Sequence, residues 1–240
     1  MKSKNRKAEL TTQQIVVITI LVASFAVLLF FLIRLNLGEE TQKEICHNSV
    51  ILKGKGSTIS GSGTLDCKTN YVCISSSDNG VCKDFVSTEI KKVSQENKNE
   101  TLKTIADEMA GCWWMFGEGK IDYSGAKVSR ACTICSVIGF DSINQEITYT
   151  DLQGFLKSNS LSGKQEKYFD YLFSGGVPKI FETGGTIDYT KKYYVVTGRT
   201  DSVKIPFIGT SVKDATVIPV HFVDSDELTN LKCDSFITKA

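Results

Sequence analysis

The stretch IVVITILVASFAVLLFFLI, from Ile15 to Ile33, decides how this chain is organised. It contains no charged residue, proline or glycine, and its polar groups are the hydroxyls of Thr19 and Ser24, which can bond back to the preceding helical turn. As a helix it would be about 28 Å long, close to the hydrocarbon thickness of a bilayer. We therefore predict a transmembrane helix in residues 15–36, between a tail at 1–14 and a polar connector at 37–45.

A cleaved secretory signal and a buried core helix are the alternatives for this stretch. A signal would be shorter and would end in a small-x-small cleavage site, whereas the residues after Ile33 read RLNLG. A core helix is rarely apolar on all faces over such a length. The stretch therefore indicates an uncleaved anchor, which would contact the lipid bilayer.

The charges beside this stretch predict its orientation. Four basic residues and only one acidic residue, Glu9, precede it; the basic ones are Lys2, Lys4, Arg6 and Lys7. Basic residues stay on the cytoplasmic side of a membrane. We expect a cell-membrane protein with a cytoplasmic N-terminus and an extracytoplasmic domain at residues 46–240.

The charge of the predicted outer part excludes one class of partner. Beyond residue 34 the chain holds 23 basic and 26 acidic residues, and no basic stripe is evident. Nucleic-acid binding usually requires a clustered basic surface. We therefore expect no nucleic-acid partner, and an envelope protein is the expected partner class.

All eight cysteines lie after the apolar stretch, which predicts a disulfide framework in an oxidising compartment. Free thiols are the alternative if the topology is inverted. Asn79-Gly80 is typical of a hairpin turn, and a Cys73–Cys82 bridge would close that hairpin. The other pairings are left open among Cys46, Cys67, Cys112, Cys132, Cys135 and Cys233.

Cys132-Thr-Ile-Cys135 has the spacing of a redox dithiol or of half a zinc site. Its neighbours have the composition of a strand, whereas redox chemistry favours a helix N-terminus. Residues three apart on a strand point to opposite faces, so each cysteine could meet a different partner, for example Cys112 or Cys233. We predict structural disulfides, with a thiol oxidoreductase as the alternative.

The outer domain is predicted to be α+β, with a mainly antiparallel sheet and two to four helices. The apolar spacing predicts a helix over 101–116, with Lys103, Asp107 and Glu108 on its polar face. Shorter helices are expected at 150–158, capped by Thr150, and at 162–173, capped by Ser162. Strands are expected at 46–52, 131–140, 179–189, 193–200, 216–223 and 236–238.

Trp113 and Trp114 form the densest aromatic point of the outer domain. They suit a binding platform, but Trp113 also fits the apolar stripe of the helix. We therefore expect Trp113 in the core and Trp114 at its edge. After them, Glu118 and Asp122 flank Lys120, as at an exposed helix end or a weak cation site.

Few other residues suggest chemistry. His47 and His221 are single histidines, which are more often structural than catalytic, and no phosphate-binding loop or nucleophile elbow is present. Asn99-Glu-Thr is a glycosylation sequon. We predict no catalytic residue, no metal site and no cofactor.

The tetrad Lys7-Ala8-Glu9-Leu10 resembles the cleavage site of archaeal prepilin-like signals. Proteins of that kind keep the apolar helix after cleavage and assemble through it. Cleavage near Ala8 is therefore a second hypothesis, in which the protein is a pilin-like subunit.

Two further segments carry a wider resemblance, Ile45 to Val50 (ICHNSV) and Ala106 to Lys120 (ADEMAGCWWMFGEGK). With Cys132, Cys135 and the terminal Cys233-Asp-Ser-Phe236, they resemble uncharacterised single-pass membrane proteins of small-genome archaea. The resemblance implies the same architecture and carries over no catalytic residue. We expect a non-catalytic envelope protein with a structural or interaction role.

Overall fold

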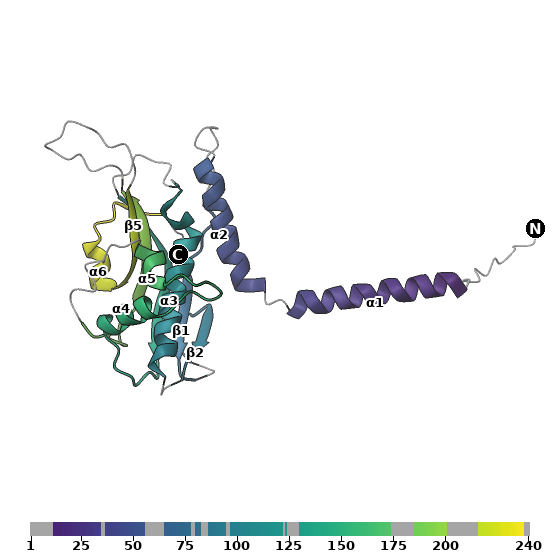
Figure 1. The fold of residues 1–240 in the computed structure, drawn as a ribbon, viewed down its shortest axis with the longest axis horizontal. Helices are drawn as coiled ribbons and strands as arrows, with labels where there is room; N and C mark the ends of the chain where they lie inside the picture. The colour runs from purple at the N-terminus through teal and green to yellow at the C-terminus, as the bar shows by residue number, and fades with distance from the viewer. Residues whose placement is uncertain are drawn as a thin grey trace, which may run out of the picture. The chain divides into compact units, whose positions relative to one another are not determined.

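The computed structural model describes most of the chain (Figure 1). It divides into two units, Met1–Thr41 and Gln42–Ala240. The described residues are 12–34, 37–55, 65–77, 80–82, 86–94, 97–121, 123, 130–173, 185–200 and 216–237.

The first unit contains helix α1, Thr12–Arg34. Its side chains are described from Gln14 to Phe30, and all of these are exposed. As expected, the hydroxyls bond back along the helix, from Thr19 to the Ile15 carbonyl at 2.8 Å and from Ser24 to the Ile20 carbonyl at 2.5 Å. Within the described residues, no helix combines the length and the hydropathy needed to cross a membrane. The transmembrane assignment of residues 15–36 stays a prediction.

Helix α2, Leu37–Lys55, forms where a strand was predicted at 46–52, so that strand prediction is wrong. The same helix runs through residues 37–45, which were predicted as a polar connector. Among the residues of α2 with described side chains, 42–54, Cys46 and Val50 are the buried ones, with 2% and 0% exposure. They are four residues apart, which is the spacing of one helix face rather than of a strand.

The second unit is built around one mixed sheet, in the order β2-β1-β3-β4-β5, with β6 also paired to β3. The domain is α+β, as expected. The sheet was predicted to be mainly antiparallel, and that prediction is wrong because the sheet is mixed. β1 pairs in parallel with both β2 and β3, whereas β4 is antiparallel to β3 and to β5. The strands are β1 Asn70–Ser75, β2 Glu89–Lys92, β3 Arg130–Asp141, β4 Tyr193–Thr200, β5 Thr216–Asp224 and β6 Ser235–Phe236.

Some predicted strands are absent or shorter. The hairpin after β1 is not formed, because Val81 and Cys82 are in no strand and, among the described residues, β1 pairs in parallel with β2 and β3. The predicted turn residue Asn79 lies outside the described residues. Of the strand predicted at 179–189, the described part has only an isolated bridge between Thr186 and Thr148.

The helices of the second unit agree better with the sequence. Helix α3, Lys98–Met115, confirms the helix predicted at 101–116. Helix α4, Tyr149–Ser158, is capped by Thr148 rather than by Thr150, and α5 covers only Tyr168–Phe173 of the predicted 162–173. The chain also forms the short 3-10 turn η2, Gly117–Gly119, and helix α6, Ser225–Asn230.

The hydrophobic core lies between the sheet and helices α3, α4 and α5, which cover one face of it (Figure 1). Ile105, Met109 and Leu152 are fully buried there against Ile138 and Phe222. A second, smaller cluster consists of Cys132, Val196 and Val223. Leu228, Leu231 and Cys233 pack against it. Both faces of the central strands are therefore covered with apolar side chains.

Candidate interaction site

Four disulfides use all eight cysteines, which confirms the predicted framework. The one pairing predicted by residue number, Cys73–Cys82, is formed although its hairpin is not. The other pairs are Cys46–Cys67, Cys112–Cys135 and Cys132–Cys233.

The two cysteines of Cys132-Thr-Ile-Cys135 have different partners on opposite sides of the sheet. Cys132 bonds to Cys233 in the smaller cluster, and Cys135 bonds to Cys112 on α3. In an oxidised redox pair, the two cysteines would be bonded to each other. Here they are not. This arrangement matches the structural interpretation of the spacing.

A β-bulge in β3 explains how Cys135 and Ser136 both reach α3. Ile134 and Ser136 pair with Val196 and Val195, which are neighbours on β4, so Cys135 is an extra residue. A bulge turns two consecutive side chains toward one face. Cys135 thus bonds to Cys112 while the Ser136 hydroxyl donates to Glu108 on the same helix.

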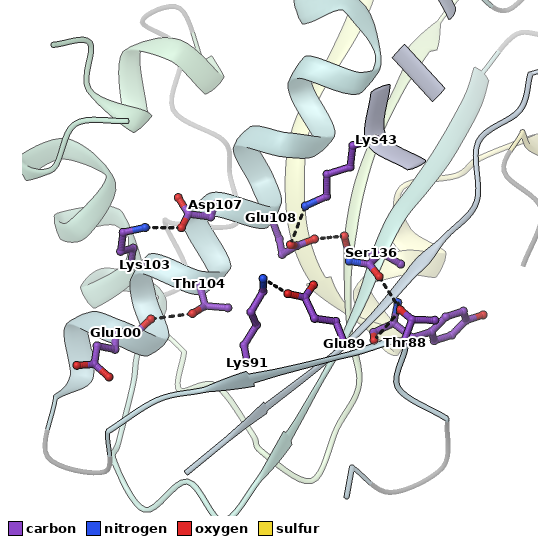
Figure 2. A network of polar contacts seen from close by, with 12 residues as sticks. Lys43, Thr88, Glu89, Lys91, Glu100, Lys103, Thr104, Asp107, Glu108 and Ser136 are labelled. Carbon is purple, nitrogen blue, oxygen red and sulfur yellow. Dashed lines mark hydrogen bonds and ion pairs between the residues drawn. The ribbon is translucent and has the colours of Figure 1, made fainter. Parts of the chain in front are cut away.

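A polar network around Glu108 connects helix α2 to α3 and to strand β3 of the sheet (Figure 2). The Glu108 side chain is 3% exposed, and its carboxylate accepts from the Lys43 ammonium at 3.2 Å and from the Ser136 hydroxyl at 2.5 Å. A buried carboxylate needs such partners to offset its lost hydration. The Lys43 side chain runs alongside Gly111, where an added Cβ would meet it at ordinary van der Waals distance.

A second contact between α2 and α3 joins His47 to Trp114. Their rings are stacked, with centroids 4.1 Å apart and planes 13° from parallel. His47 Nδ1 lies 2.7 Å from the Trp114 carbonyl, which can only accept, so Nδ1 carries a proton. In the neutral ring, Nε2 then keeps its lone pair. Trp113 is buried and Trp114 is partly exposed, as predicted.

The chain then makes a left-handed turn at Gly117-Glu118-Gly119, with φ of 74°, 53° and 75°. Such angles suit glycine and cost a residue with a side chain about 1 kcal/mol or more. The turn gives Glu118 two donors, the Lys120 ammonium at 2.6 Å and the Tyr171 hydroxyl at 2.9 Å. The Lys120 bond and, more weakly, the Tyr171 bond hold the pKa of Glu118 below its ordinary value against partial desolvation.

These residues form one pocket, which we call the His47 pocket. Its volume is 220 Å³, and it is lined by His47, Trp114, Gly117, Glu118, Lys120 and Ile121. It offers an aromatic pair, a ring nitrogen and an ion pair, which suits an interaction with a polar and aromatic partner surface. Residues from two segments far apart in sequence, His47 on α2 and 114–121 at and after the end of α3, meet at this pocket.

The remaining predicted residues lie apart from the His47 pocket. His221 is on β5 and partly buried, and desolvation lowers its pKa. Asn99 is exposed in the first turn of α3, where its sequon is accessible at the asparagine. Asp122 lies outside the described residues. Among the residues with described positions, no three His, Cys, Asp or Glu side chains form a group that could hold a metal.

Sequence reasoning missed the buried role of Glu108, which was assigned to the polar face of its helix. The signal was present, because Ile105, Glu108 and Cys112 are spaced by three and four residues on one stripe. Lys43 and Ser136 could not be found in this way, since they come from α2 and β3 and meet Glu108 only in the fold.

Comparison of the chain with protein-family models, with curated proteins and with solved structures finds no significant match.

Proposed function

We propose that this protein is a single-pass envelope protein, anchored by residues 15–33, whose disulfide-bonded outer domain has a non-catalytic interaction role. The observation that carries the proposal is the pairing of an apolar, exposed helix with a domain whose cysteines are all bonded. Exposed apolar surface on this scale is typical of contact with lipid or protein. Disulfides form outside the cytosol.

The anchor is tested by placing charges in α1. Leu21 and Leu28 are 64% and 61% exposed, and each lysine near the centre of a span costs about 3 kcal/mol. The wild-type chain is expected in the carbonate-resistant membrane pellet, and the L21K/L28K variant in the soluble fraction. The matched control is L52K, which alters an exposed leucine of α2 and should leave the protein in the pellet. A wild-type chain that stays soluble without detergent would contradict the proposal.

The orientation is tested separately with a reporter at the C-terminus. Alkaline phosphatase is active only where its disulfides form, so the proposal expects an active fusion and a dark green-fluorescent-protein fusion. The opposite result would place the domain in the cytoplasm.

The interaction role is assigned to the His47 pocket. A photo-crosslinking residue at Lys120, whose side chain is 76% exposed, is expected to give a defined adduct in native membranes. The same residue at Lys103, which is 52% exposed on α3 and does not line the pocket, should not give that adduct. W114A should abolish the Lys120 adduct, because it removes the stacked partner of His47.

A pilin-like subunit is the second candidate, and α2 is the observation that favours it. Helical structure resumes only two residues after α1 and continues into the outer domain, where a connector was expected. An apolar helix α1 followed closely by a helix α2 that belongs largely to the outer domain suits assembly through α1. Mass spectrometry of the native N-terminus separates the two candidates: a chain cut after Ala8 supports the pilin-like subunit, and an intact chain eliminates it.

A further inference from the structure

A second and larger pocket, of 420 Å³, lies at one end of the central strands. We call it the switch-point pocket. Three segments line it: Val81 and Cys82 after β1, Asp141 and Ile143 at and after the end of β3, and Tyr189 and Lys192 before β4. Its volume falls in the range of roughly 300–1,000 Å³ that is usual for small-molecule sites.

The sheet topology explains why a pocket forms there. β1 and β3 are parallel neighbours, and Ser75 at the end of β1 pairs with Asp141 at the end of β3. The chain leaves β1 toward β2 on one side and leaves β3 toward β4 on the other. Connections that part in this way leave a crevice beyond the carboxyl ends of the strands, where open sheets generally bind ligands.

A carboxylate is held in a fixed orientation at this crevice. The Ser75 hydroxyl donates to one oxygen of Asp141 at 3.1 Å, and the Ser142 hydroxyl donates to the other at 3.2 Å. Each carboxylate oxygen can accept more than one hydrogen bond. Asp141 is therefore oriented in advance and can still accept from the hydroxyls of a ligand.

The wall beside Asp141, formed by residues 80–82, is also held in place. The Cys73–Cys82 disulfide ties the segment after β1 back to the strand. Gly80 packs directly on Ser75, where any side chain would clash with it. A wall fixed before binding lowers the entropy cost of holding a ligand.

An aromatic surface completes the pocket. The rings of Phe140 and Tyr189 lie 4.9 Å apart, and the Tyr189 hydroxyl donates to the Gln145 carbonyl, which fixes the ring. The negative face of an aromatic ring attracts weakly polarised C–H groups. This surface suits the C–H face of a sugar ring.

The charges of the pocket favour a neutral ligand. Lys191 pairs with Asp224 at 2.8 Å and with Asp226 at 3.0 Å, so its positive charge is more than offset. Asp141 and Lys192 then contribute one charge of each sign to the lining. We infer that the switch-point pocket binds a neutral sugar unit of a glycan, with Asp141 accepting from its hydroxyls and Tyr189 stacking on its ring.

The experiment is saturation-transfer NMR on the full chain, in a detergent without a sugar headgroup. The probes are the methyl glycosides of glucose, galactose, mannose and N-acetylglucosamine. We expect saturable transfer to at least one of them, strongest at the C–H protons of one ring face. D141N and Y189L should each weaken binding about tenfold or more, as expected for loss of a hydrogen bond to a charged group or of a ring contact.

Matched variants separate binding from folding. Y189F keeps the ring face but loses the hydroxyl bond that fixes it, so it should weaken binding less than Y189L does. D170N alters an exposed aspartate outside the pocket and should have no effect. D141N and Y189L are compared only after thermal unfolding shows the wild-type midpoint, and D141E replaces D141N if that variant does not fold. Absence of transfer to all four glycosides would overturn the inference. So would competition by inorganic phosphate, which would indicate an anion site, or binding unchanged in D141N and Y189L.

The inference does not depend on the anchor. If the L21K/L28K variant is soluble and still binds the glycoside, both the anchor and the sugar site are supported. If glycoside binding fails, the result of the membrane fractionation still stands.

Discussion

At the scale of single residues, buried Glu108 shows how one carboxylate joins three elements, through an ion pair and a hydrogen bond. Lys43, Glu108 and Ser136 come from α2, α3 and β3. Removing one partner of a buried pair costs more than the pair itself contributes, because the other charge is left without compensation.

We expect K43M to lower the free energy of unfolding by about 1–3 kcal/mol, since methionine keeps the apolar stem of lysine and removes the charge. Denaturant unfolding measures the change. K103M is the matched control: Lys103 pairs with Asp107 on the exposed side of α3, and its loss should cost less than about 1 kcal/mol. Adding E108Q to K43M should recover part of the loss, and a purely additive double variant would contradict the coupling.

His221 predicts a pH dependence of stability. Desolvation lowers its pKa in the folded protein below the ordinary value of 6.5. The unfolded chain therefore binds more protons than the folded one at pH values just below 6.5, so stability falls as the pH is lowered through that region. H221Q should reduce the slope of the unfolding free energy against pH there. An unchanged slope would show that other groups cause the acid sensitivity.

At the scale of elements, the start of α4 depends on a capping box. Thr148 accepts from the Asp151 backbone N–H at 3.1 Å, and Asp151 accepts from the Thr148 backbone N–H at 2.8 Å. The sequence predicted the helix but assigned the cap to Thr150. Thr148 and Thr150 are both hydroxyl residues within one turn, so residue type alone did not separate them; Asp151 three residues after Thr148 was the missed signal.

We expect D151N to destabilise the domain by about 0.5–2 kcal/mol near neutral pH, through loss of the cap and of the Lys98 contact. Hydrogen bonds from Lys98 and then from Thr148 lower the pKa of Asp151 from 3.8 to about 2. Its contribution is therefore complete above pH 3.8 and is lost as the pH falls toward 2. The wild type and D151N should converge in urea unfolding at low pH. A difference that persists there would exclude the carboxylate as its source.

The sheet illustrates where local patterns mislead. The strands β3, β4 and β5 were predicted nearly to the residue, because their runs of apolar and β-branched residues are long. The predicted hairpin closed by Cys73–Cys82 was wrong, because an Asn-Gly pair near a strand suggests a hairpin whatever the strand pairs with. β1 instead pairs in parallel with β2 and with β3, whose paired residues lie more than 60 positions from it in sequence.

At the scale of the whole molecule, the disulfides differ in how much chain they constrain. Cys132–Cys233 joins residues 101 apart, whereas Cys73–Cys82 joins residues nine apart. Closing a longer loop removes more conformational entropy from the unfolded chain.

We therefore expect the C132A/C233A variant to lose about 2 kcal/mol more unfolding free energy than C73A/C82A. Guanidinium unfolding of the two double variants measures this difference. Equal stability losses would show that local packing, rather than loop length, sets the contribution of each bridge.

The Cys73–Cys82 bridge also holds one wall of the switch-point pocket in place. C73A/C82A should therefore weaken glycoside binding more than C132A/C233A does.

The sequence by itself determined the apolar helix at residues 15–33, the disulfide class, helix α3 and the long strands β3 to β5. These follow from composition and from spacing over a few residues, so neighbours along the chain are enough to specify them. Only the tertiary structure decided the parallel pairing of β1, the cysteine pairing in three of the four disulfides, the Glu108 network and the two pockets described above. Each of these joins residues that are far apart in sequence, and the partner of a buried group is chosen by which surfaces pack together, which no local pattern records.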